Sequence, residues 1–112
     1  MDVTTLARRY IDEGLLHDRL PGIHYWQRAG GREAMLVGHR ISVADVIETY
    51  HGSSNDAEET ADYFTLPRWL VDQALDYYVE RHEEIDQQLE KKYETAEREE
   101  AAWRERQRIL AK

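Results

Sequence analysis

The sequence predicts a mainly α-helical protein with one small β-hairpin, organised as a helix-turn-helix-like trihelical unit with a long C-terminal helix. Three observations support this prediction. Apolar residues recur at helical spacing over most of the chain. An aromatic stretch at residues 23–27 is followed by two glycines and then by a second apolar stretch, as in a hairpin. No residue between Pro67 and Leu110 demands that a helix should end.

The length of 112 residues suits one folded body with an extension. We assign residues 1–89 to a trihelical domain with an N-terminal helix and a β-hairpin, and residues 90–112 to a charged C-terminal helical extension. The chain contains no cysteine, which excludes disulfides and thiolate metal sites and is typical of a reducing compartment. The first residues lack a signal-peptide pattern, and no apolar run approaches the ~20 residues of a membrane-spanning helix. We therefore expect a cytoplasmic protein that does not enter a membrane.

An N-terminal helix is expected over residues 3–20, because apolar residues share one face there and Pro21-Gly22 then breaks the pattern. The face carries Leu6, Tyr10 and Ile11. A hairpin is expected over residues 23–37. Its first strand is aromatic and β-prone, and Gly30-Gly31 tolerates the positive φ of a tight turn.

Two short helices should follow the hairpin. Ser42 can cap the first, with the charge of Asp45 at the third position favouring the helix N-terminus, and Gly52 ends it. Asn55 is expected to cap the second helix, with Glu58 completing a capping box. This helix should be acidic and should end near residue 63.

Pro67 is expected to open the long helix, where its missing N–H costs nothing. Apolar and aromatic residues alternate spacings of four and three along it, which is a heptad-like seam. The seam consists of Val71, Leu75, Tyr78, His82, Ile85 and Leu89. Beyond Leu89, one of the two seam positions continues at a spacing of seven residues, through Ala96, Trp103 and Leu110. An unbroken helix to Leu110 would be ~65 Å long at ~1.5 Å per residue.

The seam predicts a homodimer. A core explains Val71, Leu75 and Tyr78, but by Ile85 and Leu89 the helix is expected to have left the body. Apolar residues on a projecting helix need cover, and a second copy can supply it through helix-on-helix packing across the six seam residues. The alternative is that the N-terminal helix folds back over the seam.

Two sequence blocks resemble a known family. The run Gly38-His39-Arg40-Ile41-Ser42-Val43, followed by Ile47 and Gly52, resembles the Gly-Thr-Arg-Ile-x-Val signature of domain of unknown function family 433. Downstream, its Tyr-Pro-x-Leu…Val…Ala-Leu-x-Tyr block is matched by Tyr63, Leu66, Val71, Ala74-Leu75 and Tyr77. The resemblance covers roughly residues 30–90. The chain departs from the family pattern at Arg32, His39, Phe64 and Pro67.

Members of that family are described as small antitoxin-like proteins with a helix-turn-helix fold. They resemble VapB-type antitoxins and often accompany a PIN-like nuclease toxin. The resemblance implies a bacterial or archaeal regulatory protein that dimerises and binds a cognate toxin, operator DNA, or both. The alternative is a homo-oligomeric protein-interaction module that never touches DNA.

A helix-turn-helix reading of residues 56–67 and onward would place Arg68 and Gln73 at the major groove, where Arg suits guanine and Gln suits adenine. A second basic cluster lies in and after the hairpin, at Arg28, Arg32, His39 and Arg40. Charge argues against autonomous DNA binding, because residues 1–89 hold 17 of the 23 acidic but only 8 of the 15 basic side chains. The simpler interpretation is an acidic, solvated face, with Arg40 paired to a local carboxylate.

No catalytic chemistry is evident in the sequence. There is no nucleophile elbow, phosphate-binding loop or dinucleotide fingerprint, and the paired glycines are explained by a turn. The five histidines do not have metal-ligand spacing. We expect a protein that is not an enzyme and that needs no cofactor or metal.

Overall fold

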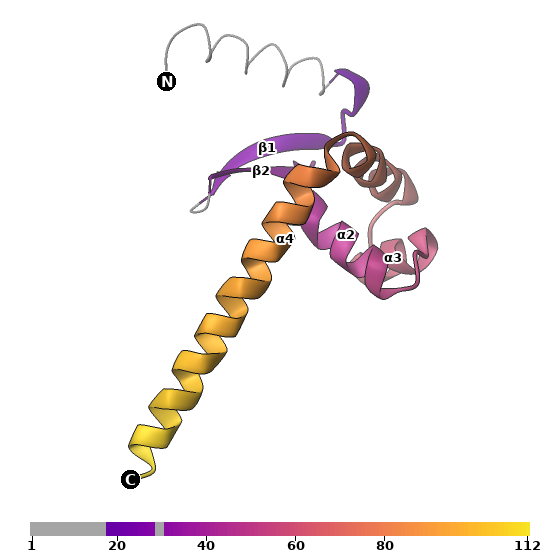
Figure 1. Cartoon of the computed structure of the whole chain (residues 1–112). Coiled ribbons are helices and arrows are strands. Elements are labelled where there is room, and N and C mark those ends of the chain that lie inside the picture. Colours follow the sequence, from indigo (N-terminus) through magenta and orange to yellow (C-terminus); the bar gives the residue numbers. More distant parts are fainter. Residues whose placement is uncertain (1–17, 29–30) are drawn as a thin grey trace, which may run out of the picture.

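The computed structural model describes residues 18–28 and 31–112. It contains a two-stranded antiparallel sheet, β1 (Ile23–Arg28) and β2 (Gly31–Leu36), and the helices α2 (Val43–Gly52), α3 (Ala57–Phe64) and α4 (Arg68–Leu110). The sheet, α2, α3 and the first part of α4 form a body, from which the rest of α4 projects (Figure 1). The mainly helical fold with one hairpin and a long last helix is confirmed. Most of the helix expected at residues 3–20 lies outside the described residues.

The hairpin pairs as the sequence predicts. Its register runs from Ile23 opposite Leu36 to Arg28 opposite Gly31, so two residues connect the strands. Gly31 has a φ of +116°, which only glycine adopts readily. Ile23 and Leu36 are both buried, so the base of the hairpin, and not its tip, is the end that joins the core.

The predicted capping of α2 is confirmed and is reciprocal. The Ser42 side chain accepts a hydrogen bond from the backbone N–H of Asp45 (3.0 Å). The Asp45 carboxylate in turn accepts from the backbone N–H of Ser42 (3.1 Å). Two otherwise orphaned donors are satisfied in this way, so the entry to α2 is fixed locally.

The predicted cap of α3 is wrong by one residue. Asp56, not Asn55, is the N-cap, and its carboxylate accepts from the backbone N–H of Glu59 (3.0 Å). An N-cap residue needs extended backbone angles, which Asp56 has, whereas Asn55 has a left-handed φ of 62°. The helix ends at Phe64, and Pro67 is the N-cap of α4, one residue before the helix proper.

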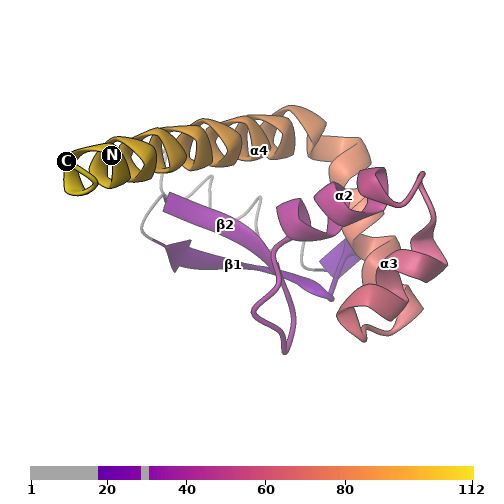
Figure 2. The same cartoon turned by 90° about the horizontal axis from the view of Figure 1, so that it is seen from below.

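α4 is not a straight helix, contrary to the sequence-based expectation. Its backbone leaves helical geometry at Arg81 (φ −132°, ψ 41°), and the bend is visible from a second direction in Figure 2. The surrounding residues include no proline or glycine. Tyr77 and Ile85 flank the break and are both fully buried. Eight residues of straight helix would turn these two side chains about 80° apart, so the bend lets both reach one core.

The break also divides the predicted seam. The buried residues of α4 are Leu70, Val71, Ala74 and Tyr77 before the break and Ile85 and Leu89 after it. Leu75 and Tyr78 are half-buried, and His82 is exposed. The expectation that Ile85 and Leu89 lie beyond the body is therefore wrong. Since the chain covers these residues itself, the argument that assigned the six seam residues to a dimer interface no longer holds.

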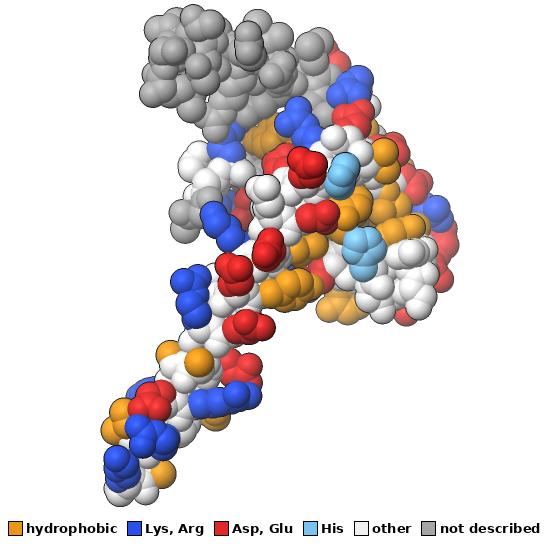
Figure 3. All heavy atoms as spheres, viewed as in Figure 1, with side chains coloured by type: hydrophobic (Ala, Val, Ile, Leu, Met, Phe, Trp, Pro, Cys, Tyr) orange, Lys and Arg blue, Asp and Glu red, His pale blue; other side chains and the backbone are white. Residues whose placement is uncertain are grey.

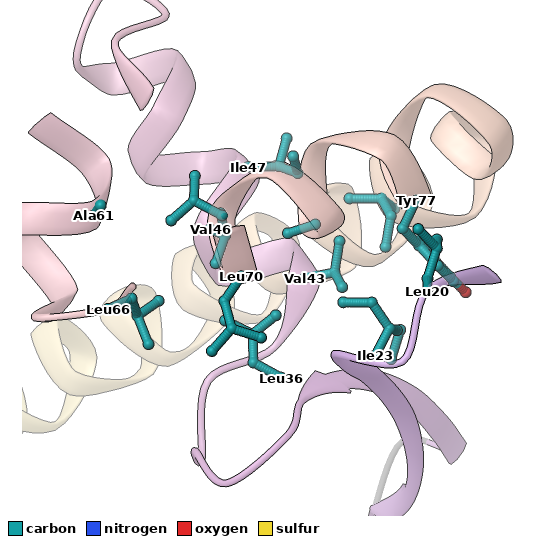
Figure 4. Close-up of a cluster of buried hydrophobic side chains, with 14 of the residues drawn as sticks. Leu20, Ile23, Leu36, Val43, Val46, Ile47, Ala61, Leu66, Leu70 and Tyr77 are labelled. Carbon is teal, nitrogen blue, oxygen red and sulfur yellow. The ribbon is translucent and has the colours of Figure 1, made fainter. Parts of the chain in front are cut away.

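The core joins every described element. It contains residues from the hairpin, α2, α3 and both parts of α4, and Figure 4 shows several of them converging between the helices and the base of the hairpin. Val43, Val46 and Ile47 present one face of α2 to α4 and are fully buried. The body is therefore held by one continuous apolar cluster.

We predict that Ile85→Ala lowers the free energy of unfolding by about 2–5 kcal/mol, because it leaves a cavity in the core. Urea denaturation followed by circular dichroism measures this. Ile109→Ala is the matched control, because Ile109 is 55% exposed on the same helix, and should change stability by less than about 0.5 kcal/mol. Equal effects of the two substitutions would contradict the placement of Ile85.

Candidate interaction surfaces

The part of α4 beyond residue 89 leaves the body. Every residue from Glu90 to the C-terminus is exposed. The last polar tie to the body is Lys92, whose ammonium lies 3.1 Å from the Glu48 carboxylate and 3.7 Å from that of Asp45, both on α2. The hydrogen bond to Glu48 raises the pKa of Lys92. We call residues 93–110 the arm.

The arm carries a stripe of apolar side chains that the body does not cover. Tyr93, Trp103 and Leu110 are 53%, 60% and 64% exposed. Together with Ala96 they recur at spacings of three and seven, which places them on one face of a helix. Ile109 is also exposed but lies on the opposite face.

Local ion pairs support the helix in the arm. Arg104 reaches the Glu100 carboxylate at 2.5 Å across one turn of the helix. Arg108 reaches Glu105 at 2.5 Å, and hydrogen bonding from Arg108 lowers the pKa of Glu105. These pairs are fully solvated, so they support helix formation and do not bury any part of the stripe.

Arg68, a predicted base-reading residue, lies at the start of α4 between two carboxylates. Its guanidinium is 2.9 Å from Asp72 and 2.5 Å from Glu58 of α3. Hydrogen bonds to Asp72 and Glu58 raise the pKa of Arg68. The side chain connects α3 to α4, and its neighbours make the local surface acidic.

Gln73, the second predicted reading residue, is turned toward the chain itself. Its side-chain oxygen accepts a hydrogen bond from the backbone N–H of Gly22 at 2.6 Å. A Cβ atom at position 22 would lie 2.6 Å from that oxygen and 2.7 Å from Leu70. Gln73 and the glycine together fix the segment that leads into β1.

The predicted basic cluster of the hairpin is divided between its two ends. Arg28 and Arg32 lie at the tip, where Arg28 is 3.7 Å from Glu33 and the Arg32 guanidinium lies over the Tyr25 ring, 5.6 Å from its centroid. Arg40 follows the base of the hairpin and is exposed. It forms no ion pair with any residue that the structure describes, so the expected local carboxylate partner is not found there.

A polar cluster that sequence reasoning missed lies beside the bend in α4. The Tyr77 hydroxyl donates to Glu84 at 2.9 Å and lies 3.0 Å from the Tyr25 hydroxyl. Burial is the main reason that the pKa of Tyr77 is raised far above its ordinary value. The seven-residue spacing of Tyr77 and Glu84 was the available signal, but nothing local indicated that Tyr25 would join them.

The histidines contribute ring contacts. Tyr78 lies between His51 and His82, with centroid distances of 5.7 and 6.4 Å. In residues 18–28 and 31–112, no three His, Cys, Asp or Glu side chains gather as a metal site would require. Over the same residues, no helix combines the length and the apolar character needed to cross a membrane.

We predict that Gln73→Ala destabilises the fold by about 1–2 kcal/mol, because the part-buried Gly22 N–H loses its acceptor. The readout is the midpoint of urea unfolding. Gln87→Ala, at an exposed position of the same helix, is the control and should have little effect. If Gln73→Ala were as silent as the control, its side chain would be available for ligand binding after all.

Comparison with known proteins yields no match of any of the three kinds sought. No family model, curated protein or solved structure matches this chain.

Proposed function

We propose that this protein is an antitoxin-like, cytoplasmic regulatory protein that works as a protein-interaction module, with the arm as its binding surface. The observation that carries the proposal is the uncovered apolar stripe. Tyr93, Trp103 and Leu110 are each more than half exposed on a helix that has left the body. Aromatic and apolar residues in such a position are typical of surfaces that another protein covers.

The shape of the surface favours a protein ligand. A single projecting helix offers a ridge and no enclosed cavity, and ridges of this kind bind into grooves through residues spaced three, four and seven apart. The body provides a fixed origin for the ridge, because Leu89 is packed in the core and Lys92 is paired with α2. The arm therefore projects from the body in a defined direction (Figure 1).

The resemblance to the antitoxin-like family supports a PIN-like toxin as the partner. Within that interpretation, α3 and the start of α4 form the helix-turn-helix-like unit, joined by the three residues 65–67. Operator DNA, bound by the dimer or toxin complex, would have to be read through Arg40 and the hairpin. The polar groups of Arg68 and Gln73 are already bonded within the chain.

The second candidate is a homo-oligomeric interaction module that uses the same arm. One observation favours it. The arm changes from acidic to basic along its length, so that one copy can complement another. The two candidates share the binding surface and differ in what occupies it.

We predict that Trp103→Glu and Leu110→Glu each weaken partner binding at least about tenfold, because each places a charge where an apolar side chain should be buried. The protein is tagged, expressed at its native level and purified, and a PIN-like protein is sought among the proteins that co-purify with it. Loss of the stoichiometric partner from both variants is the expected result.

Ile109→Glu is the matched control, since it adds the same charge at an exposed apolar position on the opposite face. Partner retention by this variant would tie binding to the stripe. Retention of the partner by all three variants would remove the arm from the proposed function.

A further inference from the structure

The arm and the residues that flank it are divided by charge. Residues 90–100 hold five acidic and three basic side chains, whereas residues 101–112 hold one acidic and four basic. On the face shown in Figure 3, acidic side chains gather where α4 leaves the body and basic ones gather at its C-terminal end. The near-neutral sum over residues 90–112 therefore conceals two oppositely charged halves.

Helical spacing sets these charges beside the apolar stripe. Glu97 and Arg104 are seven residues apart and lie along one edge of it. Glu99 and Arg106 have the same separation and lie along the other edge. The order is the same on both edges, with the acid nearer the body and the base nearer the C-terminus.

We propose that the arm is the interface of a homodimer in which two copies pair antiparallel, centred between Ala101 and Ala102. This proposal rests on the homo-oligomeric candidate of the proposed function, and it names a second copy as the occupant of the arm. In this register Tyr93 packs against Leu110 of the partner subunit, and Ala96 faces Gln107 of the partner subunit. The two Trp103 side chains lie near the centre, within about one helical turn of each other.

Opposite charges along the edges of the stripe support this arrangement. Glu97 faces Arg104 of the partner subunit and Glu99 faces Arg106 of the partner subunit. Each pair occurs twice by symmetry. A parallel pairing would instead bring the two bodies together at the same end of the arm, and residues 1–89 of each copy carry a net charge of −9. Among the described residues, Glu97, Glu99 and Arg106 have no ion-pair partner within their own chain.

The antiparallel arrangement also keeps the two bodies apart. Pairing residues 93–110 of both copies occupies about 27 Å of helix. Each body joins its arm at Leu89 and Lys92, just outside this length, so the bodies lie at opposite ends of the paired region. Neither the core nor the Lys92 ion pairs would have to open.

Reversing the charges tests the pairing. We expect the full chain to dimerise in sedimentation velocity and light scattering. Glu97→Arg with Glu99→Arg makes both edges basic, and Arg104→Glu with Arg106→Glu makes both edges acidic. Each double variant alone should dimerise on the order of tenfold or more weakly. An equimolar mixture of the two should restore the dimer as a heterodimer, which shows that neither variant has lost its helix.

Lys91→Glu with Arg98→Glu is the matched control. It reverses two basic side chains on the outer face of the same helix and should leave dimerisation unchanged. A wild-type chain that stays monomeric, or variants that do not complement each other when mixed, would overturn the proposal.

Engineered cysteines test the orientation, because the natural chain has none. Ala96→Cys and Gln107→Cys should form a disulfide with each other when the two variants are mixed. Neither variant should form a disulfide between two of its own copies. In the antiparallel register the two identical cysteine positions lie about 16 Å apart along the helix axis, which is beyond disulfide reach. Self-linking of each variant without cross-linking would show a parallel pairing and overturn the proposed orientation.

The outcomes also separate this inference from the proposed function. A monomeric chain that still loses its protein partner on Trp103→Glu would reject the homodimer and keep the arm as a binding surface for another protein. A dimer that responds to the charge reversals, with no other protein retained, would support the homo-oligomeric candidate. Failure of both assays would reject the arm as an interaction surface.

Discussion

The buried hydroxyl of Tyr77 is the interaction on which the shape of the molecule depends. It lies at the point where the hairpin meets both parts of α4, and its side chain is fully buried. Its one proton goes to Glu84, across the bend, so the Tyr25 hydroxyl must donate to it from β1. Because burial raises the pKa of Tyr77, the hydroxyl keeps that proton at any ordinary pH. The Tyr77 hydroxyl oxygen thereby joins the hairpin to the two segments of α4 on either side of the bend.

The bend that this contact spans determines where the arm goes. Tyr78 makes a second contact across the bend, donating to Asp86 at 2.7 Å, so two successive tyrosines join the segments on either side of Arg81. A non-helical residue inside a helix costs backbone hydrogen bonds, and the burial of Ile85 and Leu89 offsets that cost. The packing of Ile85 and Leu89 in the core consequently determines the direction in which the arm projects. A change at Ile85 would redirect the arm as well as weaken the body.

The features that the sequence predicts are those that neighbouring residues determine. The hairpin follows from its turn glycines, and the cap of α2 follows from Ser42 and Asp45, three residues apart. Adjacent Asn55 and Asp56 can both cap a helix, and the choice depends on backbone angles that composition does not encode. The bend could not be predicted, because the core contacts on either side of it form only on folding, among them the contact of Tyr77 with Tyr25, more than 50 residues earlier in the chain. Distant partners also explain why the sequence suggested that Arg68 and Gln73 were available to bind a ligand. Glu58 and Gly22, which bind them, are brought close only by folding.

The apolar side chains of α4 are mostly buried before Leu89 and exposed beyond Lys92. This difference indicates which part of the helix is available to bind a partner. Up to Leu89, most apolar residues of α4 are packed into the core, and only Trp69 and Val79 among the large ones are more than half exposed. Residues 1–89 carry a net charge of −9. Beyond Lys92, nothing in the described part of the chain covers Tyr93, Trp103 or Leu110, and exposed ion pairs within the arm support its helix. Because the described part of the chain does not cover the stripe, its apolar side chains contribute little to the stability of the fold. The stripe is therefore best explained by binding, and the charge gradient along its edges limits which surfaces can bind it.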